Sequence, residues 1–177
     1  IWYDQAGSTV FARLEGAFIE MGTPAPHSVV NADNTWIWLN QFRQVIRLDG
    51  RTPRVISAPI ELQLKNLVSV SDAVATLMDS KYILSFPTDD VTWVYDLKKQ
   101  FWSQWGEWRE EVAGWTRWIG ETSVQVDAWG LDIVGGKRGN LYLYHPFIPH
   151  DDGQVIRCRY LSPHFNHGTY QRKVSKV

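Results

Sequence analysis

Trp93-Val94-Tyr95-Asp96 is a short segment whose pattern recurs along the chain. The other copies are Ile1-Trp2-Tyr3-Asp4, Ile46-Arg47-Leu48-Asp49 and Tyr142-Leu143-Tyr144-His145. Each copy is rich in aromatic, aliphatic and β-branched residues, which favour strands, and each ends on Asp or His. The final residues of successive copies are 45, 47 and 49 residues apart. Spacing of about 40–50 residues with four short strands per unit predicts a β-propeller.

Short runs with a period of two residues surround these segments and supply the other strands of each unit. Polar turns such as Asp33-Asn34 and Asp49-Gly50 separate them, as antiparallel neighbours require. The predicted strands are residues 9–14, 28–32, 35–39, 44–48, 53–57, 73–78, 82–86, 92–97, 101–105, 123–128, 131–134, 140–144 and 155–160. We therefore expect an all-β chain of four-stranded antiparallel blades, with repeat units near 1–26, 27–70, 71–120 and 121–165. A β-sandwich with evenly spaced strands is the alternative.

One segment departs from the strand pattern. Ile60, Leu64 and Leu67 follow helical spacing, and Pro59 suits a first helical turn, so a short helix is expected near residues 59–67. About 3.8 units of 47 residues fit in 177 residues, and propellers typically close with four or more blades. Both ends of the sequence also look cut through structured sequence. We expect residues 1–177 to be a single propeller-like arc of a larger ring, within a longer polypeptide.

Composition excludes several classes of protein. The single cysteine, Cys158, excludes an internal disulfide framework and a cysteine-rich zinc site. The net charge of −1 argues against a dedicated nucleic-acid binder, which normally has a basic surplus. The sequence has no apolar run of about 18 residues and no signal-peptide pattern. We expect no membrane span and no cofactor.

Tryptophan is unusually frequent, with 10 residues in the chain. Five of them lie close together and alternate with charged residues: Trp102, Trp105, Trp108, Trp115 and Trp118. One interpretation is packing within and between blades, because each ring buries a large apolar area. A second is an oligomer interface, where Trp, Tyr and Arg are enriched. A third is a stacking platform for sugars, which would make the protein a carbohydrate-binding β-propeller that recognises host-surface glycans.

The acidic side chains supply only weak evidence for catalysis. They are scattered along the chain: Glu107, Glu110, Glu111, Asp127 and Asp132. A glycosidase needs two carboxylates about 5–9.5 Å apart across the scissile bond. The sequence places no two of them so, and a propeller glycosidase or lyase is the weakest hypothesis.

The remaining reactive residue types also have simple structural explanations. His145, His150, His164 and His167 lie near Asp151 and Asp152, but they follow no metal-ligand spacing in a regular element, and solvated or core histidines are expected. Cys158 falls in the predicted strand 155–160, where a buried inert thiol is expected. Residues 135–139 (Gly-Gly-Lys-Arg-Gly) lack the ending of a phosphate loop and predict a hairpin turn with exposed charge. We assign no catalytic, cofactor-binding or metal-binding residue.

The order of these weak motifs resembles a known family, the packaged-DNA stabilisation proteins of short-tailed phages, also called tail accessory or tail nozzle proteins. The segments that carry the resemblance are residues 28–39, 45–50, 53–57, 60–61, 82–87 and 92–96 with Trp102, together with 1–3 and 11–22. The resemblance covers most of residues 1–160.

The resemblance implies a β-propeller within a longer chain and a structural, non-enzymatic role in a virion. Such a protein forms a tail nozzle or hub below the portal, helps to retain packaged DNA and forms the conduit for its ejection. The expected partners are copies of itself in a ring, usually sixfold, portal-side adaptors, and tail fibres, spikes or a needle. DNA would be passing cargo only. The expected localisation is the virion tail, after synthesis in the bacterial host cytoplasm.

Overall fold

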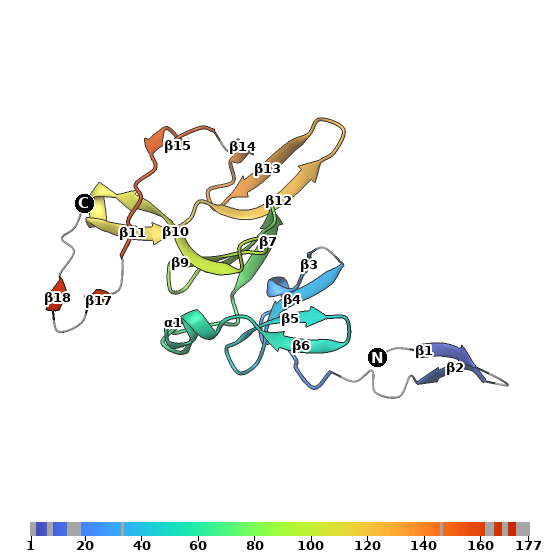
Figure 1. The fold of residues 1–177 in the computed structure, drawn as a ribbon. Helices are drawn as coiled ribbons and strands as arrows, with labels where there is room; N and C mark the ends of the chain where they lie inside the picture. Colours follow the sequence, from blue (N-terminus) through green and yellow to red (C-terminus); the bar gives the residue numbers. More distant parts are fainter. Residues whose placement is uncertain are drawn as a thin grey trace.

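The computed structural model describes the backbone of residues 3–6, 9–13, 19–32, 34–145, 147–161, 165–167 and 170–172, and the side chains of 19–32, 34–145 and 147–161. These residues are mostly β, as the sequence predicts. They form antiparallel sheets of four, five and three strands and three separate two-stranded hairpins (Figure 1).

The first sheet is a four-stranded meander in the order β3-β4-β5-β6. It follows a 3-10 turn, η1 (Pro26–Ser28), and its strands are β3 (Val30–Ala32), β4 (Thr35–Leu39), β5 (Val45–Asp49) and β6 (Thr52–Val55). All four strands were expected within two residues at each end. A second 3-10 turn, η2 (Ala58–Ile60), continues into the helix α1 (Glu61–Lys65), which confirms the short helix near residues 59–67.

The second sheet contains five strands in the order β11-β10-β9-β8-β7. Their bounds are β7 (Val74–Met78), β8 (Lys81–Phe86), β9 (Val91–Asp96), β10 (Phe101–Arg109) and β11 (Gly114–Arg117). Asp79 and Ser80 join β7 to β8 with φ of 45° and 55°, as a tight two-residue hairpin turn requires. Strand β10 is longer than expected: its first half pairs with β9, and its second half pairs with β11 after the turn η3 (Glu110–Val112).

The third sheet has three strands in the order β12-β13-β14. They are β12 (Gly120–Val126), β13 (Leu131–Gly136) and β14 (Leu141–Tyr144). The fourth strand predicted at residues 155–160 is wrong: only β16 (Gln154–Val155) forms there, paired with β15 (His150–Asp151). Residues after β16 contact the second sheet region instead. The Arg157 guanidinium lies 2.6 Å from the Glu110 carboxylate and over the Trp108 ring.

Two further hairpins lie near the ends of the sequence. The first consists of β1 (Tyr3–Ala6) and β2 (Thr9–Arg13), and the second of β17 (Phe165–His167) and β18 (Tyr170–Arg172). Each is a separate two-stranded sheet.

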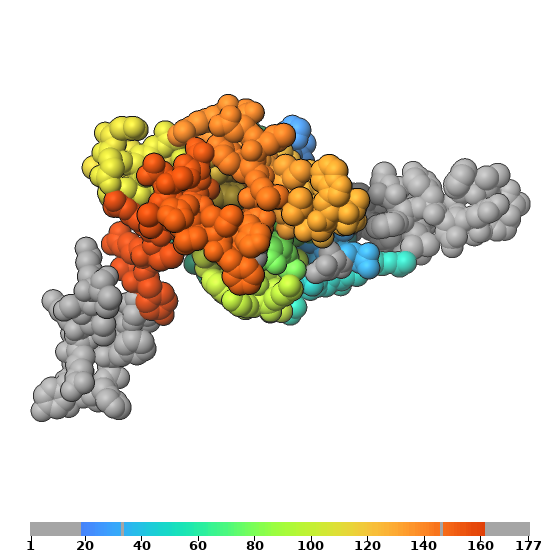
Figure 2. Space-filling model, turned by 90° about the horizontal axis from the view of Figure 1, so that it is seen from above, coloured from blue at the N-terminus to red at the C-terminus, as the bar shows by residue number. Residues whose placement is uncertain are grey.

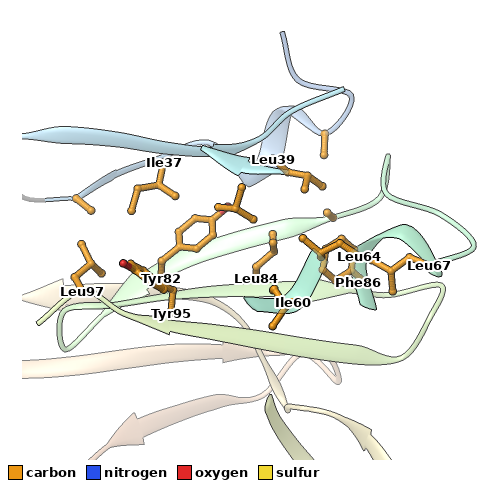
Figure 3. Close-up of a cluster of buried hydrophobic side chains, with 14 residues drawn as sticks. Ile37, Leu39, Ile60, Leu64, Leu67, Tyr82, Leu84, Phe86, Tyr95 and Leu97 are labelled. Atoms are coloured by element: carbon orange, nitrogen blue, oxygen red, sulfur yellow. The ribbon is translucent and has the colours of Figure 1, made fainter. Parts of the chain in front are cut away.

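The three large sheets pack face to face, with the second sheet in the middle (Figure 1). In Figure 3, Ile37 and Leu39 from the first sheet face Tyr82, Leu84 and Phe86 from the second. The helix α1 closes this cluster with Leu64 and the neighbouring Ile60 and Leu67. The second cluster joins the other face of the middle sheet to the third sheet: it contains Met78, Ile83, Val94, Trp118, Ile119 and Val134. Strand β8 is therefore buried on both faces, which explains its mostly apolar sequence.

The first strands of successive sheets lie beside one another: β7 contacts both β3 and β12. Polar bonds join the sheets as well. The Tyr82 hydroxyl donates to the Ser28 carbonyl at 2.8 Å, and Trp102 Nε1 donates to the Ile56 carbonyl at 2.8 Å. The described residues thus form a stack of antiparallel meanders, and they do not close into a ring.

Candidate functional site

The five clustered tryptophans form local contacts instead of one shared surface. Trp105 and Trp118 meet edge to face with ring centroids 5.4 Å apart, and Trp108 and Trp115 do the same at 5.6 Å. The ring of Trp102 instead packs on Tyr95, at 5.1 Å. Such pairs stabilise packing through ring geometry and buried area.

The indole N–H groups show the same structural use. Trp102 Nε1 donates to the Ile56 carbonyl of the first sheet, and Trp118 Nε1 donates to the Asp151 carboxylate at 3.1 Å. Trp118 is buried, whereas Trp115 is exposed. The rings of Trp102, Trp105 and Trp118 therefore serve packing between sheets, and the five rings do not converge on a ligand-sized surface.

An ion network lies where β10 meets the turn between β13 and β14. Glu107 Oε2 is 3.0 Å from Arg109 Nη2, 3.5 Å from Lys137 Nζ and 4.0 Å from Arg138 Nη2. Lys137 Nζ also donates to the Arg117 carbonyl at 2.8 Å. The network joins the second sheet to the third through one half-buried carboxylate.

Lys137 departs from the expectation of a turn with exposed charge. Its side chain is only 11% exposed, whereas that of Arg138 is 49% exposed, as predicted. Burial lowers the pKa of the Lys137 ammonium, and the Glu107 carboxylate partly offsets this. No local pattern around Lys137 predicts this burial, because Glu107 lies 30 residues earlier.

Asp151 is the second half-buried acid near this network. Burial raises the pKa of its carboxyl, and the negative charge of Glu107 raises it further, while the hydrogen bond from Trp118 lowers it. Two neighbouring acids whose charges interact are a candidate catalytic pair. However, Glu107 is already paired with cations, and Asp151 is bonded to an indole, so each has a structural partner.

The other candidate carboxylates are not gathered with these two. Glu110 Oε1 binds Arg157 and Trp108, while Glu111 and Asp127 are exposed. Asp132 lies in a shallow cavity of about 330 Å³ with Asp79, between the turn after β7 and the third sheet. A second cavity, of about 260 Å³, lies between the first two sheets and includes Arg47, Arg54 and Tyr95. None of the five clustered tryptophans lines either cavity.

The histidines and the cysteine show no reactive constellation within the described part of the chain. His145 and His150 are exposed, and no group of three or more His, Cys, Asp or Glu side chains there could hold a metal ion. His164 and the side chain of His167 lie outside the described residues. The prediction of a buried thiol is wrong: Cys158 is exposed, because the strand expected around it does not form.

The feature that sequence reasoning missed is the apolar surface of residues 147–161, called here the distal segment. Six large apolar side chains are at least half exposed there: Phe147, Ile148, Val155, Ile156, Tyr160 and Leu161. In Figure 2 this orange and red part of the chain spreads over the face seen from above. A concentration of large exposed apolar side chains in one segment is a candidate interaction site.

No helix within the described residues has the length and apolar character needed to cross a bilayer. Comparison of the chain with protein-family models, with curated proteins and with solved structures gives no match.

Proposed function

We propose that this chain is a structural part of a phage tail, in the nozzle or hub below the portal, which acts by assembly and without catalysis. In this role it helps to retain packaged DNA and lines or supports the conduit for its ejection. The proposal rests on the family resemblance of residues 1–160 and on one structural observation, the apolar distal segment. Its blades would belong to a β-propeller, to which the stacked meander sheets are suited.

The distal segment has the composition of an assembly surface. Phe147 and Tyr160 are 87% and 88% exposed, among the most exposed large apolar side chains of the described residues. Arg157 and Arg159 lie between the apolar residues of this segment. Aromatic residues and arginine are enriched in protein interfaces, where a few buried rings supply most of the binding energy.

The near-neutral charge suits a conduit wall. Neutralised phosphates release counterions, and each such contact strengthens binding. A wall that lets DNA pass should therefore avoid a large basic surplus, and the chain has 18 basic against 19 acidic residues.

The test is assembly of the full protein that contains this chain with its portal-side neighbours, followed by negative-stain electron microscopy. We expect ring-shaped tail complexes. The variant Phe147→Ser/Tyr160→Ser should fail to assemble, because it removes two aromatic anchors at the distal segment.

The matched control is Leu62→Ser, which removes an exposed apolar side chain from α1, outside the distal segment. It should assemble like the unchanged protein. A full protein that stays monomeric beside its neighbours would refute the tail role. Assembly of the double variant at the control level would refute the role of the distal segment.

A carbohydrate-binding β-propeller is the alternative, and Trp129 is the observation that favours it. Its ring is 70% exposed at the turn between β12 and β13. Glycans that quench tryptophan fluorescence in the unchanged protein and not in Trp129→Ala would favour this alternative over the tail role.

A further inference from the structure

Two apolar sheet faces point away from the stack, one at each end. The middle sheet is buried on both faces, but the first and third sheets each have a partner on one face only. The third sheet exposes Val124, Leu141 and Leu143 on its outer face, with Leu141 78% exposed. The first sheet exposes Trp36 and Val55 on its outer face.

Strand registers show that the outer face of the third sheet is a packing face. Ile37 pairs with Arg47, Ile83 pairs with Val94 and Ile133 pairs with Leu143, each between the second and third strands of its sheet. Ile37 packs toward the second sheet and Ile83 toward the third, where both are buried. The equivalent pair in the third sheet faces outward, and its Leu143 is 53% exposed. The repeat therefore predicts a further sheet against this face.

The first sheet also needs a packing partner, on the face that is directed away from the second sheet. Trp38, Ile46 and Leu48 form a small cluster there, with only Ile19 and Met21 packed against it. Trp38 Nε1 is buried without a hydrogen-bond partner within the described residues. Buried indole N–H groups normally find an acceptor, so this face also lacks a partner.

The two terminal hairpins occupy complementary parts of one repeat unit. The first strands of the three sheets and β17 begin at Val30, Val74, Gly120 and Phe165, at intervals of 44, 46 and 45 residues. In the sequence repeat, β17 and β18 thus correspond to the first two strands of a fourth sheet. β1 and β2 begin 42 and 43 residues before β5 and β6, the third and fourth strands of the first sheet.

We propose that β17-β18 and β1-β2 join edge to edge into one four-stranded sheet, which packs between the outer faces of the third and first sheets. The stack would then close as a ring of four sheets instead of the larger ring expected from the sequence. The four strands would follow the order β17-β18-β1-β2, with β18 antiparallel to β1. This closure does not depend on the proposed function.

The existing sheets also define the register of the new pairing. In the recurring four-residue segment, Tyr95 and Tyr144 are the residues equivalent to Tyr3. Each lies opposite the second residue of the second strand of its sheet: Tyr82 faces Tyr95, and Asp132 faces Tyr144. By this register Gln171, the second residue of β18, lies opposite Tyr3. Facing residues of antiparallel strands have Cα atoms about 4.5–5.5 Å apart, within the range that a disulfide spans.

The experiment is disulfide trapping in the full protein, on a Cys158→Ser background that removes the single thiol of residues 1–177. The first pair is Tyr3→Cys with Gln171→Cys. The second pair, Asp4→Cys with Tyr170→Cys, tests the same register one residue along. The control pair, Leu62→Cys with Gln171→Cys, places the partner thiol on the exposed surface of α1. Mild oxidation is followed by intact mass and peptide mapping under non-reducing conditions.

Closure predicts an intramolecular disulfide in at least one of the two register pairs, formed about tenfold or more faster than in the control and at a rate independent of protein concentration, because pairing raises the local thiol concentration. Disulfides between two chains would show that a second copy covers these faces and would overturn the proposal. Rates equal to the control for both register pairs would overturn it as well.

Discussion

Replacing Thr76 by valine is expected to weaken the contact between the second and third sheets. Thr76 is buried on β7, and its Oγ1 lies 2.9 Å from the backbone N of Ser123 and 2.7 Å from Ser123 Oγ. Ser123 Oγ donates its proton to the Leu77 carbonyl at 2.9 Å. The Thr76 hydroxyl therefore donates to Ser123 Oγ and accepts from the Ser123 N–H, which closes a small network between β7 and β12.

The size of the effect follows from what valine removes. Valine keeps the shape of threonine but loses two hydrogen bonds, each with a net value of about 0.5–1.5 kcal/mol. It also leaves the Ser123 N–H without its acceptor, and a partly buried orphaned donor is costly. We expect a loss of about 2–3 kcal/mol in the free energy of unfolding. Ser123→Ala keeps the N–H bond to Thr76 but loses the two bonds of the Ser123 hydroxyl, and it should cost about 1–2 kcal/mol.

The assay is urea unfolding followed by circular dichroism and tryptophan fluorescence, whose coincidence tests two-state behaviour. The control is Thr122→Val, which changes an exposed threonine on β12, the strand that contains Ser123. Its stability should stay within about 0.5 kcal/mol of the unchanged protein. The double variant Thr76→Val/Ser123→Ala should show a coupling energy of at least about 0.5 kcal/mol. If Thr76→Val loses no more stability than the control, the network does not hold the two sheets together.

Three further changes test other parts of the structure. Tyr82→Phe removes the buried hydroxyl that donates to a carbonyl before the first sheet, and urea unfolding should show a loss of about 1–3 kcal/mol; no loss would contradict the bond. Gly120→Ala puts a Cβ 2.2 Å from a ring carbon, so thermal unfolding should show a larger loss, about 1–3 kcal/mol, than for Gly114→Ala, where the nearest atom is 3.5 Å away. Asp151 keeps its proton to higher pH when folded than when unfolded, so its contribution to stability is lost as pH rises above about 4. Asp151→Asn should therefore flatten the dependence of the urea midpoint on pH above about pH 4; an unchanged slope would contradict the raised pKa.

The sequence predicted the strands whose partners lie next to them in the chain. Val91–Asp96 and Lys81–Phe86 alternate or run apolar between clear turn residues, and their partners follow within a few positions, so local pattern and pairing agree. Residues 155–160 alternate equally well, yet only the two-residue strand β16 forms there, and it ends at Val155. A period of two shows only that a segment is compatible with a strand. A strand also needs the free edge of a sheet to pair with. The chain after β14 instead leads to Glu110 and Trp108, which Arg157 contacts.

The candidate site was less predictable because its contacts are distant in sequence. Trp118 and Asp151 are 33 residues apart, and Glu107 and Lys137 are 30 apart, so neither pair leaves a local signature. A glycine-rich turn normally exposes its charges, whereas Lys137 is buried where the second sheet brings Glu107 and the Arg117 carbonyl to it. The density of tryptophan did indicate packing, since aromatic area is useful wherever sheets meet.

Two of the polar bonds between the sheets join residues that are about one repeat apart. Thr76 binds Ser123, 47 residues later, and Trp102 binds the Ile56 carbonyl, 46 residues earlier. Apolar packing has no direction, so it brings sheets together but permits them to slide. Hydrogen bonds have strict geometry, and these two lie at different ends of the meanders, one on the first strand β7 and the other on β10. The bond of Thr76 joins the second sheet to the third, and the bond of Trp102 joins the second sheet to the first. Each of the two interfaces therefore has a directional contact that opposes sliding, which helps a degenerate sequence repeat to form a regular stack.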